Sequence, residues 1–205
     1  MLDDDVVSRT LGVAMATGGD FAEVFAEDKR SSSALLDDGR IEELTSGRDR
    51  GAGIRVVVGD TTGFAHTADL SESGLASAAQ AAAAAARGGG GGTTVVDLTR
   101  HDVASPVTIE QYPEDVAKAT KVELLTDADE AARAEGGSIS QVMARYADSR
   151  RRILVANTDG LLTGDDQVKT LFSVSWGGPG GNSRPTTKKK TKNTTKVAPL
   201  ARFPG

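Results

Sequence analysis

Residues 39 to 70 hold most of the side chains whose types and spacing could do chemistry. Gly51-Ala52-Gly53 begins like a dinucleotide-binding fingerprint, in which glycines let a phosphate approach the backbone at the start of a helix. The third glycine of that fingerprint would fall at Val56, and the segment that follows reads as a strand. The glycines are therefore predicted to allow a tight turn or a bulge, and no cofactor-binding residue is expected.

The chain contains two histidines and no cysteine. His66 is expected on a strand and His101 in a linker, and neither has a second ligand at i+3 or i+4 in a helical context, which zinc sites usually use. Both are predicted to be ordinary polar positions, so no metal ligand is expected. The sequence also lacks the G-x-S-x-G turn of a serine nucleophile, and no catalytic residue is predicted.

The arginines Arg48, Arg50 and Arg55 form the most suggestive charged group. Clustered guanidinium groups can hold carboxylates or carbonyls through paired hydrogen bonds. The alternative, which we favour, is that they pair across a hairpin with acidic residues of the same segment (Glu42, Glu43 and Asp49). The other acidic pairs lie at predicted turns or on hairpin strands and are expected on the solvated surface.

Composition limits the class of protein. The 205 residues are 38% hydrophobic but only 4% aromatic, and no run of 18 apolar residues could span a membrane. The acidic N-terminus does not resemble a signal peptide, so a cytoplasmic protein is expected. The last thirty residues carry seven basic and no acidic side chains; the remainder has 17 basic against 29 acidic, a net charge of −12. Such an acidic body is a poor partner for nucleic acid.

Hydrophobic periodicity predicts an α+β fold, a mostly antiparallel sheet of hairpins and meanders covered by a few helices. The expected helices are 3–17, 71–87 and 113–136, and the expected strands are 21–27, 31–36, 40–45, 54–58, 61–67, 138–147, 151–156 and 167–175. Asp38-Gly39 is predicted to be a hairpin turn because both residues tolerate positive φ.

Local signals fix where the helices should begin and which face they bury. Asp69 followed by Glu72 resembles a capping box, and Pro113 is expected at the first position of the third helix. The buried stripe of that helix is predicted to contain Val122, Leu125, Ala128 and Ala132.

Four segments are expected along the chain: a domain at 1–87, a Gly-rich linker and loop at 88–112, a helix and strands at 113–175, and a basic tail at 176–205. The tail has no apolar period and no acidic residue, which predicts disorder. Two other interpretations remain open: a basic nucleic-acid-binding arm, or a frameshifted end, since one changed frame would turn lysine codons into glutamate codons.

The motifs of residues 20 to 87 are similar, in order and spacing, to the N-terminal domain of the TldD/PmbA (TldE) metalloprotease family. Five segments carry this resemblance: Phe21 to Glu27, Asp38 to Glu43, Gly47 to Val56, Thr62 to Ala65, and Asp69 to Ser71. It continues more loosely to about Ser175 and lies closer to TldD. The motif positions expected to have structural or interface roles are Gly47, Arg50, Gly51, Gly53, Arg55, Gly63 and Asp69.

The resemblance implies a cytoplasmic hydrolase that cleaves peptides with a zinc-activated water and works with a TldD/PmbA-type partner subunit, as a hetero- or homodimer. The family's zinc motif, H-E-x-x-x-H, lies beyond the N-terminal domain, and this sequence contains no His-Glu pair. The chain is therefore expected to be a C-terminally truncated, non-catalytic portion, inactive alone and without zinc of its own. The alternative is a stand-alone interaction domain that pairs with such a subunit or binds extended peptide.

Overall fold

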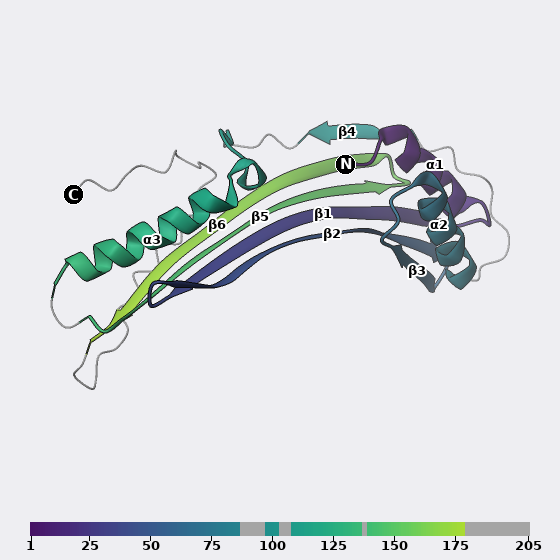
Figure 1. Cartoon of the computed structure of the whole chain (residues 1–205). Helices are drawn as coiled ribbons and strands as arrows, with labels where there is room; N and C mark the ends of the chain where they lie inside the picture. Colours follow the sequence, from purple (N-terminus) through teal and green to yellow (C-terminus); the bar gives the residue numbers. More distant parts are fainter. Residues whose placement is uncertain (87–96, 103–107, 137–138, 179–205) are drawn as a thin grey trace. The chain divides into compact units, whose positions relative to one another are not determined.

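The computed structural model describes residues 1–86, 97–102, 108–136 and 139–178. The elements run in the order α1 (Asp4–Met15), β1 (Phe21–Asp37), β2 (Arg40–Val58), β3 (Thr61–Thr67), α2 (Glu72–Ala86), β4 (Thr99–Asp102), the 3-10 helix η1 (Pro113–Asp115), α3 (Lys118–Ala134), β5 (Gln141–Asn157) and β6 (Leu161–Gly177) (Figure 1). The strands form one sheet in the order β3-β2-β1-β5-β6-β4, with β3 antiparallel to β2 and β4 parallel to β6. The predicted α+β class is confirmed.

The chain forms two compact units. Unit 1 contains Met1–Lys29, Asp49–Ala104 and Arg151–Asp166, and unit 2 contains Arg30–Arg48, Ser105–Arg150 and Gln167–Gly205. Each unit has its own buried hydrophobic cluster. None of the described helices is long and apolar enough to cross a membrane.

In unit 1, α1 and α2 pack together, and α2 also packs on β3. The Asp3 side chain caps α1 by accepting a hydrogen bond from the Asp5 N–H (3.0 Å). Val7, Leu11 and Met15, at helical spacing, are buried and join apolar residues of β1 and β2 in one core. Burial of this stripe, rather than intrinsic propensity, holds so short a helix in place.

The contact between α2 and β3 depends on small residues. Five alanines of α2 are buried, and a Cβ placed on Gly63 of β3 would lie 1.9 Å from the Ala82 carbonyl oxygen and 2.4 Å from the Ala86 nitrogen. No side chain fits there, so only glycine lets the strand approach the helix backbone. The close contact between α2 and β3 therefore explains why the predicted motif position Gly63 is a glycine.

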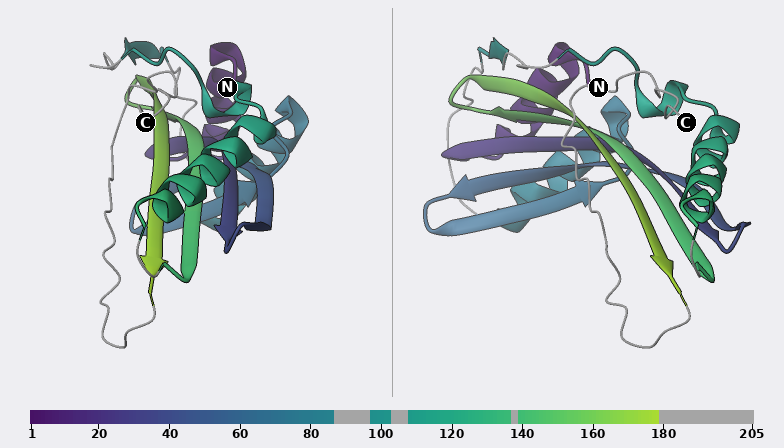
Figure 2. Two further views of the ribbon diagram at one scale, coloured as in Figure 1. Left: turned by 60° about the vertical axis from the view of Figure 1, so that its left-hand side comes forward. Right: turned by 90° about the vertical axis from the view of Figure 1, so that its left-hand side faces the viewer.

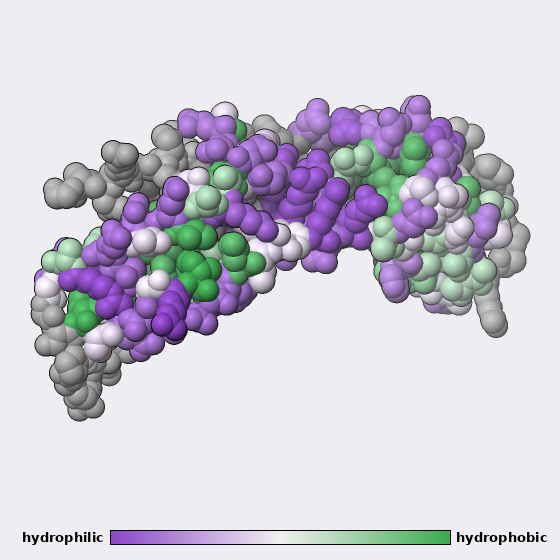
Figure 3. Space-filling view, in the orientation of Figure 1, coloured by the Kyte–Doolittle hydropathy of each residue, from purple (hydrophilic) through white to green (hydrophobic). Residues whose placement is uncertain are grey.

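In unit 2, α3 lies on one face of the strand segments, as both views in Figure 2 show. Leu125 of α3 packs with Leu36 of β1 and with Ala144 and Tyr146 of β5. The predicted stripe of α3 is correct at Leu125, which is buried, and at Ala128, which packs partly buried against the same cluster. The most buried face continues through two charged residues, Lys121 and Asp129. Figure 3 shows hydrophilic side chains over most of this side of unit 2, with an apolar patch between α3 and the β1–β2 hairpin.

Three predicted breaks between strands were wrong. The strands predicted at 21–27 and 31–36 are one strand, β1; 40–45 and 54–58 are joined in β2 through the Gly-Arg-rich segment expected to turn; and 138–147 and 151–156 are joined in β5. Ion pairs between neighbouring strands explain the first case: Asp28, buried at 6% exposure, pairs with Arg152 at 2.6 Å. Charge that is neutralised across the sheet does not interrupt a strand.

Among the remaining elements, β6, predicted at 167–175, begins six residues earlier at Leu161 and ends at Gly177, inside the predicted tail. The turn at Asp38-Gly39 is confirmed, with φ of 48° and 77°, as are α1, β3 and α2 to within one or two residues. Pro113 opens η1 rather than the helix, which begins at Lys118. His101, expected in a linker, lies on β4, a short strand that was not predicted. The glycine run 88–92 and the tail from residue 179 lie outside the described residues.

Candidate functional site

The structure describes a hollow of about 440 Å³ in unit 2, between the start of α3 and the strands β1, β2 and β5. This volume lies within the roughly 300–1,000 Å³ typical of ligand sites. Its charged lining contains more basic than acidic side chains: Arg30, Arg48, Lys118, Lys121 and Arg150 against Glu114 and Asp148. Ser31, Ser32 and Ser46 supply hydroxyl groups. The hollow is therefore polar, and basic side chains outnumber acidic ones in its lining.

A buried ion pair forms the base of this hollow. The Lys121 side chain (6% exposed) donates to Asp148 Oδ2 at 2.6 Å, to Ser32 Oγ at 2.9 Å and to the Pro113 carbonyl at 3.0 Å. Ser32 Oγ in turn donates to Asp148 Oδ1 at 2.8 Å. All three ammonium donors are used, so the pair satisfies the condition under which two buried charges are tolerated.

Tyr146 borders this network on β5. Lys121 Nζ lies 5.6 Å from the centre of the Tyr146 ring. Burial of Tyr146, together with the negative charge of Asp148, raises the pKa of its hydroxyl above the ordinary value. The tyrosine therefore stays neutral at physiological pH.

The contacts of this network bear on whether Ser32 could be a nucleophile. A serine next to a lysine can act as a nucleophile only if the lysine can accept the serine proton. Here Lys121 donates to Asp148 and to the Pro113 carbonyl, and the Ser32 hydroxyl donates to the Asp148 carboxylate rather than to the amine. The arrangement anchors η1 and α3 to the sheet.

At the side of the hollow, Glu114 forms ion pairs with two guanidinium groups. It pairs with Arg150 at 2.9 Å and with Arg30 at 4.0 Å, and the Arg150 guanidinium lies 3.5 Å from the centre of the Tyr112 ring. One carboxylate therefore faces two cations. Arg30 keeps 44% of its side chain exposed.

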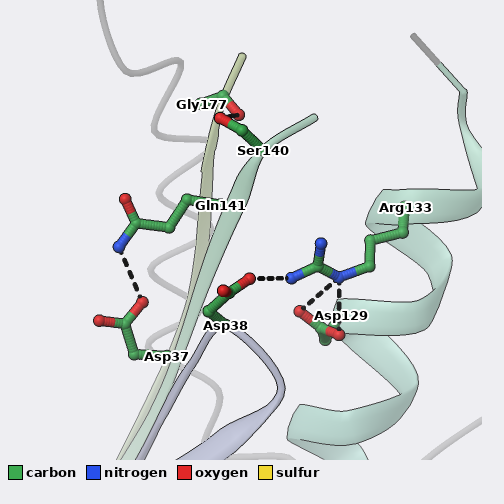
Figure 4. A network of polar contacts seen from close by, with 7 residues as sticks. All are labelled: Asp37, Asp38, Asp129, Arg133, Ser140, Gln141 and Gly177. Carbon is green, nitrogen blue, oxygen red and sulfur yellow. Dashed lines mark hydrogen bonds and ion pairs between the residues drawn. The ribbon is translucent and has the colours of Figure 1, made fainter. Parts of the chain in front are cut away.

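The other end of α3 is fixed by a second polar group (Figure 4). Arg133 pairs with Asp129 at 3.1 Å, four residues earlier on the helix, and with Asp38 at the β1–β2 turn. Nearby, the Gln141 amide donates to Asp37 at 3.0 Å. Both ends of α3 are thus held on the sheet by ion pairs.

The predicted motif residues do not gather in one site. Gly47 lines the hollow in unit 2, whereas Arg50, Gly51, Gly53, Arg55, Gly63 and Asp69 belong to unit 1. Cβ atoms at Gly51 and Gly53 would meet the Thr67 carbonyl oxygen at 2.9 Å and the Phe64 ring at 3.1 Å. These glycines allow close approach of β3 within a continuous strand, and the predicted turn is absent.

The predicted pairing of the arginines was wrong for Arg55. It pairs with Glu23 of β1 at 2.8 Å, and its guanidinium lies 5.6 Å from the centre of the Phe21 ring. Glu43 is instead hydrogen-bonded by Ser33 at 3.0 Å. Arg48 is placed in the lining of the hollow.

The start of α2 differs from the predicted capping box. The Asp69 side chain accepts a hydrogen bond from the Ser71 N–H (2.9 Å), and Ser71 Oγ accepts one from the Gly74 N–H (3.2 Å). Glu72 pairs with Arg9 of α1 at 2.6 Å. The bonds from Ser71, and to a lesser extent the charge of Arg50, lower the pKa of Asp69.

Among the described residues, no three His, Cys, Asp or Glu side chains lie close enough to hold a metal ion. His66 stacks near Phe64 on β3, with ring centres 6.3 Å apart, and the His101 carbonyl accepts from Thr163 at 2.9 Å. The donor groups of the described residues therefore do not fit a zinc site.

Two domain models of one protein family match this chain. The model of the PmbA/TldA metallopeptidase domain 1 matches residues 22–86, and the model of the central domain of the same family matches residues 111–185. The chain belongs to the PmbA/TldD metallopeptidase family. Both units of the structure therefore contain residues matched to this family.

Curated relatives agree with this assignment. A metalloprotease TldD homologue of Haemophilus influenzae is 30% identical over 161 residues, covering 76% of this chain and 33% of the relative. A metalloprotease of Methanothermobacter thermautotrophicus is 33% identical over 147 residues, covering 70% of this chain and 31% of the relative. The chain thus spans about a third of the length of these PmbA/TldD-family relatives.

Solved structures share the fold. TldE from Thermococcus kodakarensis superposes with a TM-score of 0.65 at 15% identity, covering 89% of this chain and 42% of that one. A Bacteroides thetaiotaomicron protein described as a modulator of DNA gyrase gives a TM-score of 0.68 at 15% identity, covering 91% and 44%.

Sequence reasoning missed the hollow and its buried base. Lys121 and Asp129 lie four residues before and after Leu125, and so on the face predicted to be apolar. Charged residues on such a face are the available signal, because long charged side chains are rarely buried unless paired. The side-chain partners of Lys121 lie 27 and 89 positions away and could not be named from the sequence, whereas Arg133, the partner of Asp129, lies four residues further along the same helix.

Proposed function

We propose that this chain is a non-catalytic portion of a PmbA/TldD-family metallopeptidase, one that supports assembly and peptide handling rather than hydrolysis. The observation that carries the proposal is the succession of two matched family domains, domain 1 and the central domain, in a sequence without an H-E-x-x-x-H motif. In the intact family, the resemblance implies that zinc supplies the activated water. On this proposal the chain alone is inactive and holds no zinc.

The proposed partner is a TldD- or PmbA-type subunit, in a hetero- or homodimer. The resemblance to a family that works as paired subunits supports this choice. Co-expression of the tagged full chain with a PmbA-type subunit, followed by affinity capture and size-exclusion chromatography, tests it. We expect a stable complex at equal stoichiometry; recovery of the tagged chain alone, in soluble and folded form, would contradict the proposal.

A second candidate is a stand-alone domain that binds extended peptide along a strand edge. It is favoured by β2, which pairs with β3 only from Ala52 to Val58 and is exposed from Arg40 to Arg50. An exposed edge can accept another chain as an added strand. Proline substitution at Thr45 would then reduce peptide capture and leave subunit association intact, whereas the first candidate predicts no peptide capture by the chain alone at this edge.

Two further expectations stay proposals. The protein is proposed to be cytoplasmic, and its domain limits are proposed to be 1–87 and 113–175, joined by 88–112. Limited proteolysis with mass spectrometry tests the limits, because cleavage should fall between 88 and 112. Nucleotide sequencing through codons 176–205 tests whether that segment is in its native reading frame.

A further inference from the structure

We propose that the open edge of β2, residues 42–48 in unit 2, pairs antiparallel with the same edge of a second copy of this chain. The two copies are related by a two-fold axis at Thr45, and their strands join in one sheet. The inference goes beyond the proposed function, because it concerns association of this chain with itself and rests on β2 alone.

The edge of β2 is open over a stretch longer than an average strand. On this side β2 pairs with β3 only from Ala52 to Val58, and the described residues supply no other strand there. Every residue of β2 from Arg40 to Arg50 is exposed, so both faces of this part of the strand are accessible. An edge of this kind presents backbone N–H and C=O groups to which another strand can add.

This edge lacks the features that commonly prevent strand addition. Edge strands of soluble proteins are often protected by proline, by lysine or by a very short length. Residues 40–50 contain no proline and no lysine, and Ile41 and Leu44 are 38% and 43% exposed. The charged side chains of the edge oppose pairing only where like charges meet, so the partner strand must carry a complementary pattern.

A second copy of β2 carries that pattern. With the axis at Thr45, residues at equal distances before and after it lie opposite one another on the same face of the sheet. Glu42 then meets Arg48 of the second copy, and the symmetry repeats this contact. No ion pair joins Glu42 to another described residue. Arg48 already interacts within its own chain, and the five donors of a guanidinium allow a further acceptor.

The charges also select the register. Moving the axis one or two residues toward the β1–β2 turn, or one residue away from it, brings like charges together across the two strands, which is destabilising. The like-charged pairs in those three registers are Arg40 with Arg48, Glu43 with Glu43, and Glu43 with Asp49. With the axis at Thr45, like charges meet only at Arg40 and Arg50, outside the paired segment, and two opposite-charge pairs lie inside it.

The test uses the absence of cysteine from the sequence. In the full chain, T45C places two thiols opposite one another at the axis, where oxidised glutathione should link them in a disulfide. E43C is the control on the same face, because its two copies would lie about 14 Å apart along the strands, too far for a disulfide. We expect disulfide-linked dimer to form at least about tenfold faster in T45C, measured on non-reducing gels. Equal rates would overturn the register.

Charge variants test the pairing without a cross-link. E42R opposes two arginine pairs and should weaken self-association at least about tenfold in analytical ultracentrifugation, and the swap E42R/R48E should restore it. E123R is the matched control, an exposed glutamate of α3 in the same unit, and should leave self-association unchanged. A parent chain that stays monomeric, or equal weakening by E42R and E123R, would overturn the proposal.

Other occupants of the edge give different results. A monomeric chain that captures an extended peptide at this edge would overturn self-pairing and favour the second candidate function. Association of E42R with a PmbA-type subunit, measured on the same samples, reports on the proposed function separately. Loss of self-association with that complex intact supports self-pairing through β2, and failure of that complex with a dimeric parent chain contradicts the proposed function alone.

Discussion

Replacing Lys121 by methionine tests the buried base of the hollow most sharply. Methionine keeps much of the length of the side chain and removes its charge and its three donors. The Asp148 carboxylate, with a side chain 4% exposed, would then lose its cation at 2.6 Å and keep the Ser32 hydroxyl at 2.8 Å. The substitution thus leaves a buried charge without its counter-ion.

The expected cost follows from this geometry. Removing one partner of a buried ion pair typically costs about 3–5 kcal/mol, because the remaining charge stays desolvated. We expect K121M to lower the free energy of unfolding by this amount in urea titrations followed by circular dichroism. Lys118 is exposed in the same helical turn, so K118M should change stability by less than about 0.5 kcal/mol.

A double-mutant cycle separates the ion pair from packing. In K121M/D148L no buried charge remains, and the double variant should be more stable than K121M by about 2 kcal/mol or more. A loss below about 1 kcal/mol in K121M, or additive losses in the double variant, would show that the two side chains are solvated or uncoupled and would contradict a buried ion pair.

Three other perturbations follow from the structure. G63A should lower the free energy of unfolding by at least about 3 kcal/mol, because its Cβ would overlap the backbone of α2. G12A is the control: no atom lies near its added Cβ, so it should raise the free energy of unfolding by up to about 1 kcal/mol in the same thermal or urea titrations. The pKa of Tyr146 is raised in the folded state, so the contribution of its neutral hydroxyl to stability is full below the unfolded pKa of about 10 and is lost as the pH rises through the folded value. Y146F should remove this loss of stability at alkaline pH. An unchanged pH profile of stability in Y146F would contradict the raised pKa of Tyr146. Because the pKa of Asp69 is lowered, D69A should be less stable than the parent at neutral pH, with the difference vanishing as the pH falls through that lowered value; a pH-independent difference would show that the carboxylate charge is not involved.

Local patterns were sufficient for much of the fold. The turn at Asp38-Gly39 was predictable because positive φ at two successive residues restricts the choice of residue types. The stripe of α1 was predictable because Val7 and Leu11 recur at helical spacing. These features depend on neighbours in sequence, and such neighbours are visible without a structure.

Features that depend on distant partners were not predictable. The segment around Asp28 looked too polar for a strand interior, but Arg152, 124 residues later, neutralises it. The glycines of β2 looked like a turn, and only the position of β3 shows that they provide room for the Phe64 ring and the Thr67 backbone. The buried base of the hollow joins residues 27 and 89 positions apart, so the sequence alone did not bring them together.

We return to the proposal that this chain is a non-catalytic portion of a PmbA/TldD-family metallopeptidase. The most direct measurement is the zinc content of the purified full chain, by elemental mass spectrometry, on the same sample used for hydrolysis of an unfolded peptide substrate. We expect substoichiometric zinc and no cleavage above the buffer rate. One zinc ion per chain together with chelator-sensitive cleavage would contradict it.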